Sequence, residues 1–294
     1  MDNFLLNLID KNQYELIGEG YISKSYRFKI NSKNYIILQG QLKDSFPCYK
    51  QSYQNILFLF NNGNPFIKSV KFPYKEIKLI NPDEKNIFLK NGALFYEEIE
   101  GLIFYEKYFN KINLENISNK ISRFLYELYL IPVNKFEIPE AKEKIISEFN
   151  YDIETINDYF KGNNMNKINK FRDEFLEYIK SFEDFHYIHG DLWEENMIIS
   201  KDYQDLVGIV DFDNFGLGDI SKDYATLLDF GFDFINILFE KNKQCFNDKE
   251  SFILRIKLYQ KKIEIEDLAY IIRDSNLNSR MESKIKNLKE LSLI

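Results

Sequence analysis

A polar loop followed by a β-hairpin pattern constrains the fold of this chain more than any other feature of its sequence. The loop contains His189-Gly190-Asp191-Leu192, and Asn196 follows Asp191 five positions later. The apolar run Met197–Ile199, a polar stretch and the apolar run Leu206–Phe212 then predict two paired strands. The second strand delivers Asp211. One loop and one hairpin therefore carry two carboxylates and an amide.

These side chains are the ones that γ-phosphoryl transfer requires. A carboxylate accepts the proton of the acceptor hydroxyl, while an amide and a second carboxylate hold Mg²⁺ against the phosphates. Kinases carry them in an H-x-D-L-x-x-x-N loop and a D-F-G segment, and this chain has Asp211-Phe212-Asp213 in place of D-F-G. We expect Asp191 to be the base, and Asn196 and Asp211 to be the metal ligands. His189 is the alternative base, but we expect it to pack and to orient the loop.

The same segment resembles the aminoglycoside phosphotransferase and choline kinase superfamily. Its first half is similar to the H-G-D-x-x-x-x-N motif of that family. The run Gly208–Asp213, followed by Gly218-Asp219 and Asp223-Tyr224-Ala225, is similar to G-x-I-D-x-x continuing to G-D-x-x-x-D-x-A. The structural alternative is a hairpin with ordinary turn acids. We expect Asp219 and Asp223 to anchor the loop and cap the next helix.

The resemblance implies an α+β fold that is bilobal and protein-kinase-like. The N-terminal lobe, residues 1–98, would be an antiparallel β-sheet that binds nucleotide, and the C-terminal lobe, residues 99–294, would be mostly helical and carry the catalytic and acceptor sites. A chain of 294 residues that is 45% hydrophobic can bury the core of two such lobes.

Charge and composition exclude several other classes of function. The net charge of −7, with acidic and basic residues interspersed, argues against a nucleic-acid surface. The two cysteines, Cys48 and Cys245, match no metal-ligand spacing. No apolar run reaches about 18 residues, and no secretory signal is visible. We therefore expect a cytoplasmic monomer with no nucleic-acid or membrane partner.

A glycine-rich turn near the N-terminus is the candidate lid over nucleotide phosphates. After a short helix predicted over 4–11, Tyr14–Ile17 starts a strand that enters Gly18-Glu19-Gly20 and leaves through Tyr21–Ile30. Glycine lets the backbone approach phosphates closely, so Gly18 and Gly20 are candidate cofactor-binding residues. Ser23, just past the turn, could add a hydroxyl. An ordinary hairpin turn is the alternative.

The next strand, Tyr35–Gln39, departs from the kinase pattern. Kinases place a lysine on this third strand, whereas the expected position here holds Gln39 and the nearest lysine is Lys43. Some sugar-kinase members of the superfamily also have an I-L-Q strand, so Gln39 is a candidate substitute donor. The helix predicted over Tyr49–Phe60 contains no glutamate to pair with a lysine. The missing lysine and the missing glutamate are consistent with each other, because without the lysine its partner is not needed.

Three further strands are predicted, at Glu76–Ile80, Asn86–Leu89 and Ala93–Glu98. The last runs into Tyr96-Glu97-Glu98-Ile99-Glu100-Gly101, which resembles the hinge of the family. By that resemblance Tyr96 guards the back of the adenine pocket, and the backbone of Glu97 and Ile99 pairs with the base.

The remainder of the chain is predicted to be largely helical, over Leu114–Ile131, Pro139–Tyr159, Met165–Phe182 and most of 224–294 with a break near Asn247. In this last region Asp229 and Asp233 lie four apart, hence on one helical face, and could grip the ammonium groups of an acceptor. They could equally be solvated, or cap a bend at Gly231.

The resemblance and the motifs together predict an enzyme that transfers the γ-phosphate of Mg²⁺-bound ATP or GTP to a hydroxyl of an amino-bearing small molecule, with aminoglycosides as the leading acceptors. Alternative acceptors are sugars, amino sugars, ketosamines, choline and homoserine, and Trp193 in H-G-D-L-W is shared with the ketosamine-kinase branch. The missing lysine suggests an alternative from another class of function, a pseudokinase that binds nucleotide without turnover.

Overall fold

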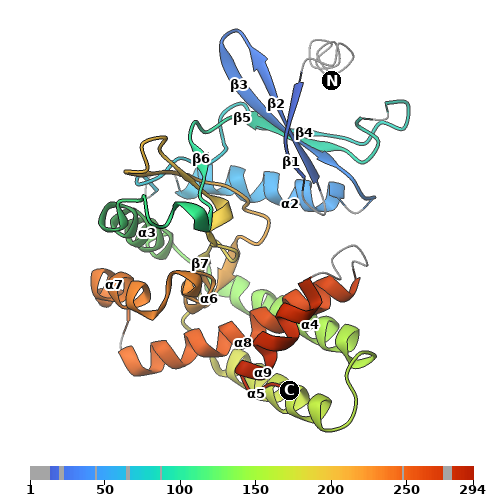
Figure 1. The fold of residues 1–294 in the computed structure, drawn as a ribbon, viewed down its shortest axis with the longest axis vertical. Coiled ribbons are helices and arrows are strands. Elements are labelled where there is room, and N and C mark those ends of the chain that lie inside the picture. Colours follow the sequence, from blue (N-terminus) through green and yellow to red (C-terminus); the bar gives the residue numbers. More distant parts are fainter. Residues whose placement is uncertain are drawn as a thin grey trace. The chain divides into compact units, whose positions relative to one another are not determined.

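The computed structural model describes residues 14–19, 23–43, 45–63, 67–86, 88–246, 248–273 and 280–294 (Figure 1). It has the predicted α+β composition, with an antiparallel sheet in the N-terminal part and mostly helices in the remainder. The chain divides into two compact units. Unit 1 comprises residues 1–128 and 193–215, and unit 2 comprises residues 129–192 and 216–294. The lobe boundary between residues 98 and 99 stays a prediction, as does the helix over 4–11, which lies outside the described residues.

The main sheet of unit 1 has five antiparallel strands in the order β1-β2-β3-β5-β4. The strands are β1 (Tyr14–Glu19), β2 (Ser23–Ile30), β3 (Lys33–Gly40), β4 (Lys78–Ile80) and β5 (Ala93–Glu97). Asn31 and Ser32 join β2 to β3 with φ values of 47° and 69°. Asparagine tolerates this left-handed conformation, which two-residue hairpin loops require.

Both faces of the sheet are apolar because its central strand alternates two hydrophobic sets. On one face Tyr35 and Ile37 of β3 pack with Phe88. On the other face Ile36 and Leu38 pack with Tyr96 of β5 and with Tyr49 of the helix α2 (Ser45–Phe58), which lies along the sheet in Figure 1.

The helix α2 begins four residues before the predicted Tyr49. Pro47 falls within its first turn, where a missing N–H breaks no helical hydrogen bond. The Ser45 hydroxyl accepts the Leu42 N–H at 3.0 Å just before the helix. A π-helical turn, Leu59–Gly63, follows α2.

The strand predicted at Asn86–Leu89 is wrong. The described residues there form turns, in which the Asn86 N–H donates to the Asp83 carbonyl and the Leu89 N–H donates to the Asn86 carbonyl. The Asn86 side chain also accepts the Phe88 N–H at 3.0 Å. Asparagine and aspartate side chains compete in this way with strand pairing.

The predicted catalytic hairpin is present in unit 1. Strands β8 (Met197–Ile199) and β9 (Leu206–Ile209) pair antiparallel, and β6 (Leu102–Ile103) adds to β8. Lys71 lies beside β9, since its N–H donates to the Val207 carbonyl and its carbonyl accepts the Ile209 N–H. The hairpin is thus held on both sides.

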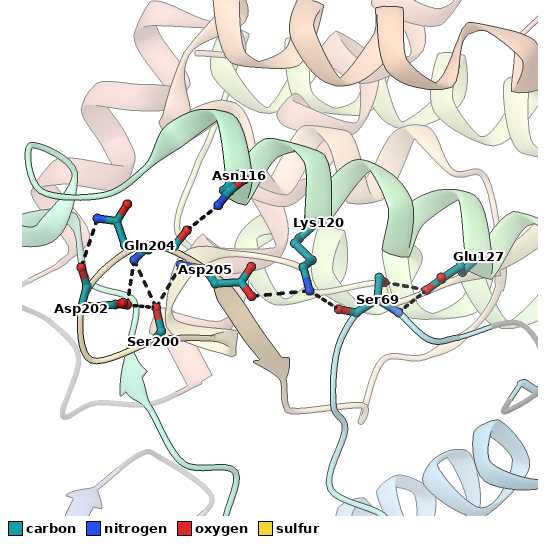
Figure 2. A network of polar contacts seen from close by, with 8 residues as sticks. All are labelled: Ser69, Asn116, Lys120, Glu127, Ser200, Asp202, Gln204 and Asp205. Atoms are coloured by element: carbon teal, nitrogen blue, oxygen red, sulfur yellow. Dashed lines mark hydrogen bonds and ion pairs between the residues drawn. The ribbon is translucent and has the colours of Figure 1, made fainter.

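The helix α3 (Leu114–Tyr129) fixes both this hairpin and the segment before Lys71 through a polar network (Figure 2). Buried Glu127 accepts the Ser69 N–H at 3.0 Å and the Ser69 hydroxyl at 2.6 Å. Lys120 donates to the Ser69 carbonyl at 3.1 Å and lies 3.5 Å from the Asp205 carboxylate, in the turn between β8 and β9. The turn and the segment are thereby tied to one helix.

Unit 2 is helical apart from a two-stranded ribbon, β7 (His186–Ile188) with β10 (Gly216–Gly218). The predicted helices at 139–159 and 165–182 are confirmed as α4 and α5, and the tail is helical as predicted. None of the described helices is long and apolar enough to cross a membrane. The helices are α4 (Ile138–Asn157), α5 (Asn163–Ser181), α6 (Ser221–Thr226), α7 (Phe232–Asn242), α8 (Lys249–Arg273) and α9 (Met281–Glu290); short 3₁₀ turns lie at Glu106–Tyr108, Lys135–Glu137, Glu194–Asn196, Leu228–Phe230 and Lys243–Cys245.

Candidate functional site

The loop that carries Asp191 is anchored by a buried carboxylate of unit 2. Asp223, in the first turn of α6, accepts the His189 N–H at 2.9 Å and the Gly190 N–H at 2.7 Å, one on each oxygen. Gly190 has φ +82°, a conformation that glycine adopts without strain. The Thr226 hydroxyl donates to the Leu192 carbonyl at 2.8 Å. Asp223 anchors the loop, as predicted.

His189 is fully buried and acts on the loop itself. Its Nδ1 accepts the Asp191 N–H at 3.3 Å, whereas the Asp191 side chain is partly exposed. A buried ring that holds the backbone of its neighbour fits the predicted orienting role of His189. A partly exposed carboxylate is able to meet a substrate hydroxyl.

Asp219 has a structural role of the same kind. Its carboxylate accepts the Ser221 N–H at 2.9 Å at the start of α6, and it also pairs with Arg255 at 2.8 Å. The Tyr178 hydroxyl donates to the same carboxylate at 2.5 Å. Burial raises the pKa of Asp219, and the nearby Arg255 charge opposes that rise. These contacts fully occupy Asp219, which agrees with the predicted anchoring and capping.

The two predicted metal ligands stand at the same end of the hairpin in unit 1. Asn196 immediately precedes β8 and Asp211 lies two residues after β9, while Met197 pairs with Ile209. The Val210 N–H donates to the Asn196 carbonyl at 3.0 Å, which joins the two flanking segments. The hairpin therefore brings the backbone segments of Asn196 and Asp211 together from positions fifteen residues apart in the sequence.

The chemistry of this end of the hairpin fits a divalent cation. Asp211 retains a solvent-exposed face, yet the surrounding protein desolvates its carboxyl, and this desolvation together with the Asp213 charge raises the pKa of Asp211 to about 7. A cation beside two carboxyls would relieve that repulsion. Amide and carboxylate oxygens are the ligands that Mg²⁺ prefers. Among the described residues, no group of three or more His, Cys, Asp or Glu side chains could hold a metal.

Tyr96 connects the main sheet to this carboxylate pair. It is buried in β5 opposite Ile36, and burial raises its pKa, with further contributions from the Asp211 and Asp213 charges. Tyr96 and the predicted metal segment are thus electrostatic neighbours within unit 1.

The predicted base-binding backbone follows Tyr96 in a restrained segment. The Glu97 N–H donates to the Lys75 carbonyl at 3.0 Å, and the Glu97 side chain pairs with Lys33 at 2.9 Å. The Glu97 side chain is therefore a surface ion pair, as expected of a residue that would act through its backbone. Ile99 packs against Gly208, where an added Cβ would lie 2.7 Å from the Ile99 side chain.

Gln39 does not join the other predicted nucleotide-binding residues. Its side chain lies on the Ile37 face of β3, and its Nε2 donates to the Phe88 carbonyl at 2.8 Å. The β3 residues that share a face with Tyr96 are the even-numbered ones, among them Ile36 and Leu38. The structure therefore argues against Gln39 as the substitute for the strand lysine, because its side chain faces away from Tyr96 and bonds the backbone.

The glycine turn is described only in part. Gly18 is in β1 beside a register shift, and an added Cβ there would make only ordinary contact, at 3.7 Å from Ser25. Ser23 begins β2 opposite Gly40. Gly20 lies outside the described residues.

The single helical face expected for Asp229 and Asp233 is wrong. Gly231, with φ +87° and ψ 161°, separates a short 3₁₀ turn, Leu228–Phe230, from α7. Asp233 is therefore in the first turn of α7, where a carboxylate is favoured by the helix dipole, and Asp229 belongs to the preceding turn. Both side chains are exposed.

Sequence reasoning missed two polar side chains of unit 1. Asn55 of α2 donates to the Phe212 carbonyl at 2.6 Å, and Arg27 of β2 forms a two-pronged ion pair with Glu98, with an Nη2–Oε1 distance of 2.6 Å. Both contacts join residues more than seventy positions apart. No local pattern in the sequence signals such pairs.

Comparisons with known proteins agree with this geometry. Residues 156–241, which include the loop and the hairpin, match the model of the phosphotransferase enzyme family. No curated protein sequence matches the chain significantly. The GDP and kanamycin complex of APH(2")-IIia superposes with a TM-score of 0.72 at 15% identity, covering 99% of each chain. The chain has an aminoglycoside phosphotransferase fold.

Two other solved structures share this fold. ADP-bound aminoglycoside phosphotransferase APH(2'')-Ib has a TM-score of 0.65 at 19% identity, covering 99% of this chain and 97% of its own. Macrolide 2'-phosphotransferase type I has a TM-score of 0.66 at 12% identity, covering 97% and 95%. The predicted protein-kinase-like fold and the stated family resemblance are thereby confirmed.

Proposed function

We propose that the protein transfers the γ-phosphoryl group of ATP or GTP to a hydroxyl of an amino-bearing small molecule, with Mg²⁺ as cofactor. The observation that carries this proposal is the hairpin end at which the segments of Asn196 and Asp211 are joined by backbone contacts, in a chain with this fold. The anchored loop with a partly exposed Asp191 supports it.

Each residue has a defined task in this proposal. Asp191 accepts the proton of the acceptor hydroxyl, and the Asp223 contacts hold the loop that carries it. Asn196 and Asp211 hold the metal, which when bound neutralises charge on the phosphates. Catalysis of this kind depends on positioning more than on covalent chemistry, which is why the anchoring residues matter.

Nucleotide binding falls to unit 1. Tyr96 closes the back of the base pocket, and the Glu97 carbonyl and the Ile99 N–H pair with the base. Because the Glu97 N–H already donates to Lys75, the carbonyl is the group of Glu97 assigned to the base. Gly18, Gly20 and Ser23 remain the proposed phosphate lid.

The structurally similar proteins support a large antibiotic that carries a hydroxyl as the acceptor. They include a kanamycin complex, a gentamicin complex and a macrolide 2'-phosphotransferase. A cationic aminoglycoside is the leading candidate, because a carboxylate-bearing surface attracts it; Asp229 and Asp233 are exposed acids in unit 2. Amino sugars, ketosamines, sugars, choline, homoserine and macrolides are the alternatives.

Asp191→Asn tests the function. We expect this isosteric variant to lose about 99% or more of turnover, since a general base contributes about a hundredfold or more, while Mg²⁺-ATP affinity stays within about twofold. Nucleotide consumption is measured against kanamycin- and gentamicin-like compounds, a macrolide, glucosamine and choline. Turnover retained by Asp191→Asn would remove Asp191 from the reaction. Tight Mg²⁺-nucleotide binding by the wild type with no acceptor turned over would favour the pseudokinase.

Replacing Asp229 and Asp233 together by asparagine tests the acceptor class. We expect KM for a cationic acceptor to rise while kcat changes little, since these acids would bind rather than react. Activity restricted to neutral sugars and unaffected by the double substitution would contradict the cationic acceptor and leave the kinase proposal standing.

A further inference from the structure

Asn55 connects α2 to the segment that carries the proposed metal ligand Asp211. The Asn55 side chain is buried, and its Nδ2 donates to the Phe212 carbonyl at 2.6 Å and lies 3.4 Å from the Asp213 carbonyl. These atoms all belong to unit 1. The Phe212 carbonyl also accepts the Phe215 N–H at 3.3 Å, so the Asn55 amide makes the shorter of these two hydrogen bonds. A hydrogen bond to a buried carbonyl is costly to lose, because the carbonyl oxygen is then less well satisfied.

The backbone at Asp211 requires such support. Asp211 has φ +64°, in the left-handed region that aspartate adopts at a cost of about 1–2 kcal/mol. A conformation of this kind persists only where its surroundings hold it. The Phe212 side chain is fully buried, 6.1 Å from Phe72 between ring centroids. Packing therefore holds the Phe212 ring, and the Asn55 amide and the Phe215 N–H together hold the Phe212 carbonyl.

The Asn55 amide is itself oriented by a neighbour one helical turn earlier. The Gln51 Nε2 donates to the Asn55 Oδ1 at 2.8 Å, which directs the Asn55 NH₂ group toward Phe212. Gln51 is exposed. The pair Gln51–Asn55 thus forms a short chain from the helix surface to the backbone that follows Asp211.

The helix α2 lacks the charged pair by which kinases connect the corresponding helix to the third strand. In kinases a β3 lysine pairs with a glutamate of the following helix, but Leu38 occupies the Tyr96 face of β3 here and α2 contains no glutamate. A neutral amide–carbonyl bond therefore links α2 directly to the metal-binding segment.

We propose that Asn55 is a positioning residue for Asp211, acting through the Phe212 carbonyl, so that α2 sets the affinity for the divalent cation. This inference rests on the proposed function, because Asp211 must be a metal ligand for it to matter. Asn55 itself contacts neither metal nor nucleotide.

The test compares Asn55→Leu with Asn62→Leu in the full chain. Asn62 is an exposed residue after α2 whose amide also donates to a carbonyl, that of Phe58 at 3.1 Å, so the control removes a similar bond that is not made to the segment following Asp211. Calorimetry measures ATP binding across a Mg²⁺ series and in EDTA. Thermal unfolding without nucleotide reports the structural cost of each substitution separately.

We expect Asn55→Leu to raise the half-saturating Mg²⁺ concentration about tenfold, equivalent to about 1.4 kcal/mol, and to leave ATP affinity in EDTA unchanged. Asn62→Leu should leave both unchanged. Gln51→Glu should shift the Mg²⁺ dependence in the same direction, because a carboxylate cannot donate to the Asn55 Oδ1 and attracts the Asn55 NH₂ away from Phe212.

A lower melting temperature of Asn55→Leu with an unchanged Mg²⁺ dependence would overturn the positioning role and leave the proposed function intact. If Asn55→Leu does not fold, the Mg²⁺ dependence of ATP binding by Gln51→Glu decides instead, since Gln51 is exposed and its substitution does not disturb the core. A wild type whose ATP binding does not depend on Mg²⁺ would overturn the proposed function, and the role of Asn55 with it.

Discussion

Gly101→Ala tests the close packing between the segment that follows Tyr96 and the hairpin. A Cβ added at Gly101 would lie 2.4 Å from the Ile198 Cγ2 and 2.6 Å from the Ile199 carbonyl oxygen. The carbonyl belongs to β8, whose Ile199 pairs with Leu102, so it cannot move aside without disturbing that pairing. Overpacking of this kind costs about 1–3 kcal/mol.

A smaller gain offsets part of that cost. Gly101 does not have a positive φ, so alanine fits its backbone and stiffens the unfolded chain, which contributes about 0.4–1 kcal/mol. We therefore expect Gly101→Ala to lower the free energy of unfolding by about 1–2 kcal/mol. Nucleotide affinity should fall as well, since Ile99 lies two residues earlier and its backbone is assigned to the base.

Urea denaturation with linear extrapolation measures the free energy of unfolding. Gly216→Ala is the matched control, because a Cβ there meets nothing within 4 Å and φ is again not positive. The control should be neutral or slightly stabilising. Equal stabilities of Gly101→Ala and Gly216→Ala would refute the steric reasoning.

Three further results are expected. Asp211→Ala should abolish the Mg²⁺ dependence of ATP binding measured by calorimetry, and an unchanged dependence would make the segment structural. Gln39→Ala should cost less than about 1.5 kcal/mol of nucleotide binding, the neutral hydrogen-bond range, and a larger loss would contradict its contact with Phe88. Burial raises the pKa of Asp223 to about 6, so the folded state binds this proton more tightly than the unfolded state. The stability that Asp223 contributes is full below about pH 4 and is lost as the pH rises through about 6. Urea denaturation should therefore show that the wild type loses about 3 kcal/mol of unfolding free energy relative to Asp223→Asn as the pH rises through this range. A difference between the two proteins that does not depend on pH would contradict the raised pKa of Asp223.

The order of elements could be predicted from the sequence, whereas the direction of individual side chains often could not. In β3 both alternating sets are apolar, Tyr35 and Ile37 on one face and Ile36 and Leu38 on the other. Alternation therefore shows that Gln39 and Leu38 point oppositely but not which of them faces Tyr96. The same strand was predicted over Tyr35–Gln39, but it extends over Lys33–Gly40, because Lys33, Asn34 and Gly40 also pair with β2 although they are not apolar.

Contacts between segments far apart in the sequence were the second feature that the sequence could not predict in general. The motif predicted that Asn196 and Asp211 meet, because a hairpin of known pattern joins them. Asn55 lies 157 positions from Phe212, in a helix whose sequence resembles any amphipathic helix with a polar residue. Likewise Asp229 and Asp233 have helical spacing, but only the φ of Gly231 shows that the helix is interrupted between them.

Leu38 has a consequence for how phosphate charge is neutralised under the proposed function. On the Tyr96 face of β3 the residues are Asn34, Ile36, Leu38 and Gly40, none of them cationic. A lysine there would contribute a charge-assisted bond about twice as strong as a neutral one, and the metal would share the phosphates with it. Without it, a cation held by Asn196 and Asp211 would carry more of the neutralisation. The position of the Asp211 carboxylate would then have to be held more precisely. The buried hydrogen bond from Asn55 to the Phe212 carbonyl is a contact that can do this.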